Sequence, residues 1–426
     1  MNSQTFKKPT GHPIVNSSPR LDYLDATRAF ALILGVVFHA GLSFVPIYIG
    51  WAVQDVSTSF LVGAFLTVSH SFRMEVFFLL AGFFSCLTLN RRGVGEFMRS
   101  RLIRIGIPFF LGWFILRPLI TSGWIMGSAS LSGDVDIWTG LIGGFKSLAA
   151  LPSGIFVGTH LWFLYYLILI TALVVVVRGI LSTLGSGGGR FLRRSDTIVA
   201  WIVDSRMSHV ILAVPTTAAL LFMDSWGMDT PDKSLIPHLP VLAVYGGFFG
   251  FGWMLNRQSG LIDRLAQMTV LRWVAAAGGA ATILLMSGFE HNPGAPFRHV
   301  THVVHAFSYA LTMWSLVFLT LGFFRRFCVC PSKFVRFVAD SSYWMYLVHL
   351  PVVVWLQVAV AELPFHWSLK LVFISLVTIG VSLLTCDLFV RPTFIGRVLN
   401  GRQRESVILS WIRSLSQRIH NGIRAK

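Results

Sequence analysis

An arginine and a histidine lie inside the first apolar stretch of this sequence. Arg28 and His39 are 11 positions apart. In a helix this spacing places the two side chains about 20° apart around the axis and about 16 Å apart along it. Ionisable groups in an apolar helix are costly and usually face a polar interior. We therefore expect both to point into one cavity, where a neutral imidazole suits a general base or an acyl acceptor. Helix packing is the structural alternative for His39.

Further ionisable residues lie at the start of the second apolar stretch. His70 and Arg73 are one helical turn apart and are expected to share a face. Glu75 lies well round the helix from Arg73, so a direct ion pair is not expected. We predict that these three residues bind substrate near the outer mouth, where His70 and Arg73 would hold a carboxylate or an oligosaccharide. Snorkelling at the membrane interface is the alternative.

Two later histidines and a tryptophan are also predicted to bind substrate. His349 follows Arg336 by 13 residues, which gives a depth of about 20 Å, similar to that of His39. The two histidines are therefore candidates to line one cavity, and a proton relay, a gate and simple packing stay open for His349. His160 and Trp162 open another apolar stretch at the outer interface, where an aromatic belt is the alternative for Trp162.

His299, His302 and His305 recur every three residues, a spacing that invites a metal interpretation. Each step of three residues turns a helical side chain about 60° from the previous one, so the three rings do not easily aim at one ion. We expect a polar vestibule here and no metal. Asp387 and Arg391, four residues apart, are expected to form a structural ion pair.

The elements that position these residues are predicted to be transmembrane helices. Hydrophobic residues make up 54% of the chain and charged residues only 12%, whereas soluble domains carry about 25% charged residues. A membrane-spanning helix needs about 20 mostly apolar residues. Ten stretches meet this requirement: 24–48, 64–89, 102–124, 159–178, 207–223, 237–256, 271–288, 300–324, 337–360 and 368–390. The predicted fold is an all-α polytopic membrane protein.

Most of the 35 lysines and arginines lie in the N-terminal segment, in alternate loops and in the C-terminal tail. This pattern follows the positive-inside rule and predicts cytosolic termini in a bacterial inner (cytoplasmic) membrane. Because the basic residues are spread in this way, we expect membrane lipid and no nucleic acid as a partner. Residues 1–20 lack the apolar core of a cleavable signal peptide.

We divide the chain into a cytosolic polar N-terminus (1–23), a membrane domain (24–392) and a basic cytosolic tail (393–426). Residues 125–158 are expected to form a long outer loop, and the glycine-rich 185–190 a flexible linker. The tail over 401–426 is predicted to form a basic amphipathic helix on the inner leaflet.

Five stretches of the chain resemble the membrane acyltransferase type 3 superfamily, and within it the glucans biosynthesis protein C branch. The first runs from Leu21 through Arg28 to His39, with the ten intervening residues that mark the family. The others are His70 to Gly82, Arg101 to Pro108, His160 to Leu164, and Ser342 to Pro351. The likeness covers nearly the whole chain in the same order.

The resemblance implies an O-acyltransferase that moves an acyl group, above all succinyl, from cytosolic acyl-CoA to hydroxyls of periplasmic glucan or another extracytoplasmic carbohydrate. It implies that His39 is catalytic, that Arg28 is its donor-side partner, and that Arg73 and Glu75 form a second motif. Arg101 and Arg104 are candidates for the phosphates of coenzyme A.

Succinyl-CoA or acetyl-CoA would be a co-substrate, and we expect no tightly bound cofactor. The oligomeric state stays open. The alternatives are a transporter or flippase for a polysaccharide or lipid-linked sugar, which would use the buried charges as a substrate path, and a structural membrane subunit.

Overall fold

The computed structural model describes residues 22–130, 133, 135–149, 159–258, 260–290, 292, 294, 297–328 and 332–424. Its regular elements over these residues are all helical. In chain order they are α1 (Asp22–Gly41), η1 (Leu42–Phe44), α2 (Phe60–His70), α3 (Arg73–Arg101), η2 (Leu102–Gly106), α4 (Ile107–Ser130), α5 (Ile137–Lys146), η3 (Thr159–Leu161), α6 (Trp162–Thr183), α7 (Ser186–Asp204), α8 (Ser208–Leu220), α9 (Leu239–Arg257), α10 (Leu261–Leu265), α11 (Val270–Glu290), α12 (Arg298–Phe327), α13 (Lys333–Val360), α14 (Trp367–Thr385), η4 (Cys386–Val390), α15 (Phe394–Asn400) and α16 (Val407–Arg424).

The described part of the chain holds eight helical segments that are long and apolar enough to cross a membrane. They are Asp22–Phe44, Phe60–Ser128, Thr159–Thr183, Leu239–Arg257, Val270–Glu290, Arg298–Phe327, Lys333–Val360 and Trp367–Val390. The pair α7 and α8, bent by 119°, makes a ninth if it counts as one broken span. The predicted all-helical, multi-pass architecture is confirmed, whereas ten spans stays a prediction.

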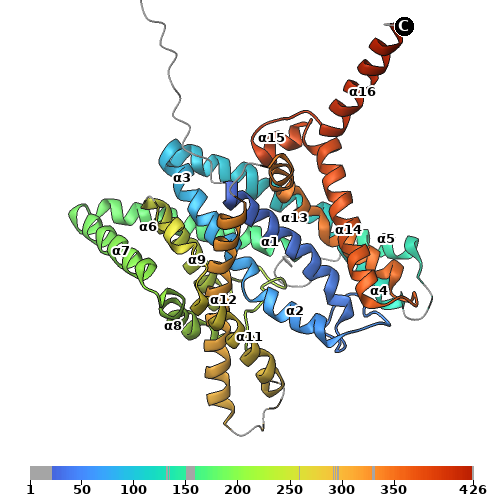
Figure 1. Ribbon diagram of the computed structural model, residues 1–426. Coiled ribbons are helices and arrows are strands. Elements are labelled where there is room, and N and C mark those ends of the chain that lie inside the picture. Colours follow the sequence, from blue (N-terminus) through green and yellow to red (C-terminus); the bar gives the residue numbers. More distant parts are fainter. Residues whose placement is uncertain are drawn as a thin grey trace, which may run out of the picture.

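Helix α1 packs inside the bundle, against α3, α12, α13 and α14. Figure 1 shows α12 on one side of α1, with α13 and α14 on the other. The outward faces of the peripheral helices are apolar; on α14, for example, Leu369 and Leu376 are both 64% exposed. Such side chains suit contact with lipid tails, so a helix carrying an arginine and a histidine is enclosed while apolar helices face outward.

Two glycines bring α3 and α9 close together. A Cβ atom added at Gly82 would collide with the backbone carbonyl of Phe249, and one at Gly252 would collide with that of Leu79. Small residues at such crossings let helix backbones approach closely in a membrane. This packing fixes the first turns of α3, which carry Arg73.

The prediction of one continuous helix over 64–89 is wrong, because the helix is interrupted between His70 and Arg73. Helix α2 ends at His70 and α3 begins at Arg73, with Ser71 and Phe72 in a turn. Ser71 donates through its hydroxyl to the carbonyl of Val68, which ends α2. The two candidate site residues therefore lie on separate helices, so their one-turn spacing does not by itself place them on one face.

The predicted flexible linker over 185–190 is also wrong. Gly185 has a φ of 51°, a left-handed conformation that glycine adopts readily, and it turns the chain into α7. Gly188 packs directly on the backbone of Leu181, where a Cβ atom would not fit. The glycines therefore make a tight helix-to-helix corner.

The predicted outer loop over 125–158 is partly helical. Helix α4 continues to Ser130, and α5 follows after Asp136, whose carboxylate accepts hydrogen bonds from the backbone N–H groups of Trp138 and Thr139. This N-terminal cap explains where α5 begins. Residues 150–158 of the predicted loop lie outside the described residues.

The predicted tail helix is confirmed over α16, and its start is fixed by a buried carboxylate. Asp387 accepts hydrogen bonds from the Ser406 hydroxyl and from the backbone N–H groups of Val407 and Ile408. The expected ion pair between Asp387 and Arg391 is present, at 3.3 Å. Beyond this point α16 projects from the bundle in Figure 1, and its apolar residues, such as Trp411, are exposed.

Candidate active site

A cavity of about 1030 Å³ lies inside the bundle next to α1. Its walls come from α1, α3, α4, α6 and α13, together with the loop after η1 and the segment after η4. Arg28 and His39 both line it, as their spacing predicts. We call the part around Arg28, Arg101, Arg104, Arg402 and Arg404 the basic end. The part around His39, His160, His349, Trp51 and Trp124 is the histidine end.

His39 lies in an aromatic and imidazole environment. Its ring is stacked on Trp51 with centroids 5.8 Å apart, and the ring of His349 is 5.3 Å away. The Nδ1 atom of His39 is buried and has no hydrogen-bond partner among the described residues. Because no described protein group binds this nitrogen, a hydrogen bond there does not fix which ring nitrogen carries the proton. His39 and His349, which the sequence leaves as candidates to line one cavity, both line it.

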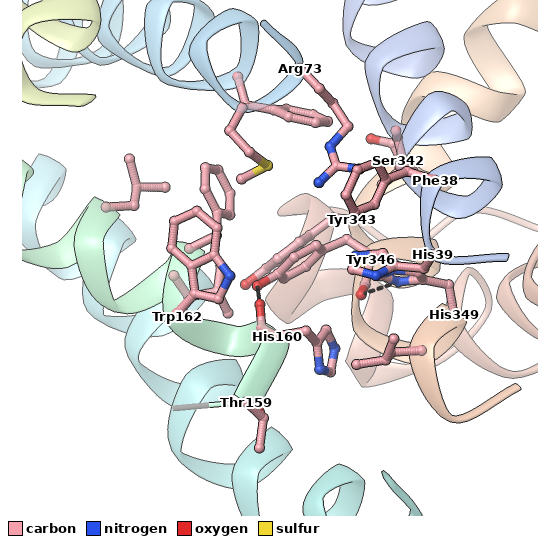
Figure 2. A pocket seen from close by; sticks show the side chains of 18 of the residues that line it. Phe38, His39, Arg73, Thr159, His160, Trp162, Ser342, Tyr343, Tyr346 and His349 are labelled. Carbon is pink, nitrogen blue, oxygen red and sulfur yellow. Dashed lines mark hydrogen bonds between the residues drawn. The ribbon is translucent and has the colours of Figure 1, made fainter. Parts of the chain in front are cut away.

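The backbone fixes the tautomers of the other two histidines. His349 Nδ1 lies 2.7 Å from the carbonyl oxygen of Tyr346, and His160 Nε2 lies 3.0 Å from that of Leu347. A carbonyl only accepts, so in a neutral ring each of these nitrogens carries the proton. The lone pairs then sit on His349 Nε2 and on His160 Nδ1, and the latter is buried without a partner. Figure 2 shows both rings near Tyr346, whose hydroxyl donates to the His160 carbonyl at 2.7 Å.

Arg28 is held at the basic end by two interactions. It donates to the carbonyl of Ala339 at 3.0 Å and lies 3.3 Å from the carboxylate of Asp25. Its side chain is still 35% exposed, so the guanidinium remains accessible from the cavity. The basic end therefore presents a positive charge whose position is fixed by α13.

Arg101 and Arg104 line the cavity together with Arg28 at the basic end. Arg101 donates to the Ser85 hydroxyl at 2.7 Å, and Arg104 follows it in the π-helical turn η2. Sequence reasoning missed two further arginines here, Arg402 and Arg404, because they fall in the predicted tail. Arg404 is ion-paired with Asp340 of α13, which brings the segment after α15 back to the bundle.

Arg73 and His70 both line the cavity although they lie on different helices. The Arg73 guanidinium sits 4.0 Å above the ring of Phe38, and its Nη1 atom is buried without a hydrogen-bond partner among the described residues. His70 lies 3.3 Å from the Tyr309 hydroxyl and 3.1 Å from that of Thr230. In Figure 2 Arg73 points toward the same space as His39 and His349. An anion in this space would meet an unpaired guanidinium.

Trp162 and Glu75 differ in their relation to the cavity. Trp162 lines it, on the side opposite His39 in Figure 2. Glu75 is fully buried and is not among the lining residues, and neither of its carboxylate oxygens has a hydrogen-bond partner among the described residues. Glu75 and Arg73 form no ion pair, as expected. The predicted substrate-binding role of Glu75 stays a prediction.

Two of the three histidines at the start of α12, His302 and His305, contact Trp226. His302 stacks on its ring with centroids 4.9 Å apart, and His305 lies 3.1 Å from its carbonyl oxygen. His299 is exposed. These contacts fit a polar packing role in this vestibule.

Two cavity residues, and a glutamine that binds one of them, gave no signal in the sequence. Trp51 lies in a loop, and Trp124 near the end of a predicted span reads as an interfacial aromatic residue. Gln357 accepts a hydrogen bond from the Trp51 indole at 2.9 Å, and donates to the carbonyls of His39 and Ala40 at 3.0 and 3.1 Å. Only long-range contacts bring these residues to His39, so helix periodicity does not identify them.

The fold and the cavity define a multi-pass membrane protein whose apolar bundle encloses basic, imidazole and aromatic groups. The acyltransferase domain family matches residues 21–387, and the chain belongs to that family. The protein is therefore an O-acyltransferase.

Curated relatives carry the name glucans biosynthesis protein C. The proteins of Escherichia coli strain K12 and of Escherichia coli O9:H4 strain HS are each 25% identical to this chain over 347 residues, which are 77% of this chain and 81% of the relative. No solved structure matches the chain.

Proposed function

We propose that this enzyme transfers an acyl group, above all succinyl, from cytosolic acyl-CoA to hydroxyls of periplasmic glucan in the bacterial inner membrane. The observation that carries the proposal is the single cavity with two unlike ends, because a donor bearing phosphates and a neutral sugar need different surroundings. The relatives named for glucan biosynthesis support glucan as the acceptor. Succinyl-CoA and acetyl-CoA are both co-substrates that the basic end can accept.

The proposal includes ten membrane spans with both termini in the cytosol. The segment Phe60–Ser128 supports this count because it has 69 residues, whereas one crossing takes about 20. Gly93, with a φ of 76°, breaks the helical geometry within it, so there is a point at which the chain can turn. The eight segments give nine crossings if Phe60–Ser128 crosses twice. The bent pair of α7 and α8 then makes the tenth. In this arrangement the basic loops, and with them the basic end of the cavity, lie on the cytosolic side.

Donor binding falls to the basic end in this proposal. Arg101 and Arg104, with Arg402 beside them, bind the phosphates of coenzyme A, since guanidinium groups form charge-assisted bonds to phosphate oxygens. Arg28 binds the acyl-CoA donor at a point close to its thioester group. The helix α16 lies on the anionic inner leaflet, where its exposed apolar face meets lipid.

Acyl transfer takes place at the histidine end. His39 takes the proton from an acceptor hydroxyl, whose oxygen attacks the thioester carbonyl; the C–O bond of the ester forms, the C–S bond breaks, and the proton passes to the leaving thiolate. A second route, in which His39 briefly carries the acyl group, uses the same residues. His349 and His160 offer lone pairs beside it. Arg73, with its unpaired Nη1, and His70 bind the acyl carboxylate or the glucan, while Glu75 and Trp162 support binding from the α3 and α6 sides.

The experiment is mass spectrometry of periplasmic glucans from cells with and without this protein. We expect an acyl substituent to disappear in cells without it, and the lost mass distinguishes succinyl from acetyl. Unchanged acyl substitution would contradict the proposal. Loss of the periplasmic glucan itself would favour a transporter.

A further inference from the structure

The cavity wall next to His39 contains two tryptophans from distant parts of the chain. Trp51 comes from the loop between η1 and α2, and Trp124 from α4. Both line the cavity, and their rings meet edge to face with centroids 5.0 Å apart. We call this pair the tryptophan corner. It lies directly beside His39, since the ring of Trp51 is stacked on that imidazole.

A close backbone contact creates the tryptophan corner. Gly127, one turn after Trp124, packs against the carbonyl of Ala52, where a Cβ atom would collide. Trp51 directly precedes Ala52 in the chain. The close approach at Gly127 therefore brings Trp51 onto the face of α4 that carries Trp124. The absence of a side chain at Gly127 is therefore a requirement of the corner.

The side chain of Gln357 orients the Trp51 ring. The last carbonyls of a helix lack partners within the helix, and Gln357 of α13 donates to two of them, those of His39 and Ala40. Its amide oxygen accepts from the Trp51 indole N–H. One amide thus links the end of α1, the catalytic candidate and the tryptophan.

The loop that carries Trp51 is tied down along its length. The backbone N–H of Asp55 donates to the carbonyl of Ser43 at 2.9 Å, and that of Ser59 donates to Phe44 at 2.8 Å. The Asp55 carboxylate pairs with Lys370 at 2.7 Å, and these side chains are 1% and 2% exposed. A loop held in this way presents a fixed binding surface, so binding there does not have to order it first.

Polar groups outside the basic end also line the cavity. They include Thr230, Asp232 and Lys233, and His70 contacts Thr230. An aromatic surface with a few polar groups matches a pyranose ring, whose C–H faces pack on indole rings while its hydroxyls bind carboxylate, ammonium and hydroxyl groups.

We propose that the tryptophan corner is the subsite that binds a sugar ring of the acceptor beside His39. The inference rests on the proposed function, because it assumes a carbohydrate acceptor. It goes further in naming the residues that hold the acceptor, which neither the family match nor the relatives' names assign.

The test measures acyl transfer from succinyl-CoA to purified, unsubstituted periplasmic glucan by the full-length protein in lipid nanodiscs. Trp124→Leu should raise the acceptor KM about tenfold, since it removes one wall of the corner. The donor KM should stay unchanged. Trp124→Phe, which keeps an aromatic face, should restore most of the acceptor affinity. Trp138→Leu is the matched control, because Trp138 is 74% exposed and does not line the cavity.

The outcomes separate this inference from the proposed function. An unchanged acceptor KM in Trp124→Leu would overturn the subsite while the wild-type activity stands. A loss of kcat together with a lower melting temperature, and no selective change in acceptor KM, would also overturn it, because it would indicate a structural role. Failure of the wild-type protein to acylate glucan would overturn the proposed function and this inference together.

Discussion

The two ends of the cavity differ in charge and in the way their side chains are held. At the basic end, the side chains of Arg28 and Arg404 are 35% and 29% exposed, and each has a carboxylate partner. At the histidine end, the rings of His160 and His349 are bound to backbone carbonyls, and Trp51 is bound to Gln357. Guanidinium groups suit a ligand that carries phosphates, whereas fixed neutral rings suit proton transfer at one position.

This difference separates binding from chemistry. The charges at the basic end bind the donor equally before and during the reaction. Their loss should therefore weaken donor binding without slowing the chemical step. Groups at the histidine end act on the reacting bonds, so their loss should lower kcat. Substitutions at the two ends should therefore change different kinetic constants.

The largest expected effect is on His39. His39→Ala should lower kcat about 10²–10⁴-fold, because it removes the general base, with no matching rise in the donor KM. Steady-state kinetics with succinyl-CoA and glucan measure both constants. His299→Ala is the control, since that histidine is exposed and outside the cavity. A rise in the donor KM with an intact kcat would show that the division between the two ends is wrong.

The next effect concerns the fixed loop at the histidine end. Lys370→Met leaves the buried Asp55 carboxylate without its partner and should cost about 3–5 kcal/mol of stability. Arg264→Met breaks an ion pair whose side chains are 52% and 51% exposed, and should cost about 0–1 kcal/mol. Thermal unfolding in detergent compares the two variants. Equal losses would mean that burial of the loop pair does not stabilise this end.

The Lys370→Met variant should also respond to pH. Burial already raises the pKa of the Asp55 carboxyl in the wild-type protein, with Lys370 opposing the shift. Without Lys370 the folded-state pKa lies further above the unfolded value, so protonation favours the folded state. The stability deficit relative to wild type should therefore shrink as pH falls through the folded-state pKa. A deficit that grows on acidification would contradict this reasoning.

A smaller effect is expected at the basic end. Arg104→Gln should raise the donor KM about tenfold with little change in kcat, because it removes one charge-assisted bond to phosphate. The wild-type donor KM should itself rise with ionic strength, and less so in the variant. Arg99→Gln is the control, since its side chain is 71% exposed and does not line the cavity. An equal rise of the donor KM in both variants would contradict a phosphate site at Arg104, because it would show that only the overall surface charge affects donor binding.

The sequence predicts that site residues lie close together when they are on the same face of one helix or at the same depth in the membrane. Arg28 and His39 share a helix, so helical geometry places them on one face, and the depth of His349 follows from its distance to Arg336. Trp51 depends instead on a glycine contact with α4 and on an amide from α13. Such contacts between distant segments have no local periodicity, so the sequence alone does not reveal them.

The predicted class of fold is equally local in origin, because apolar stretches of membrane length identify helices. Their interruptions are harder to predict. The break between His70 and Arg73 has no proline or glycine to mark it, whereas the glycines at 185–190 suggested a linker and instead form a corner. Tertiary packing decides both cases.

The most direct test of the account places the two substrates on opposite sides of a membrane. In oriented vesicles containing the full-length protein, acyl transfer should occur when succinyl-CoA is supplied at the face that bears Arg101, Arg104 and Arg402, and glucan at the opposite face. It should fail when the two are exchanged. Transfer that requires both substrates on the same face would contradict the account that donor and acceptor enter the cavity from opposite faces and meet at His39.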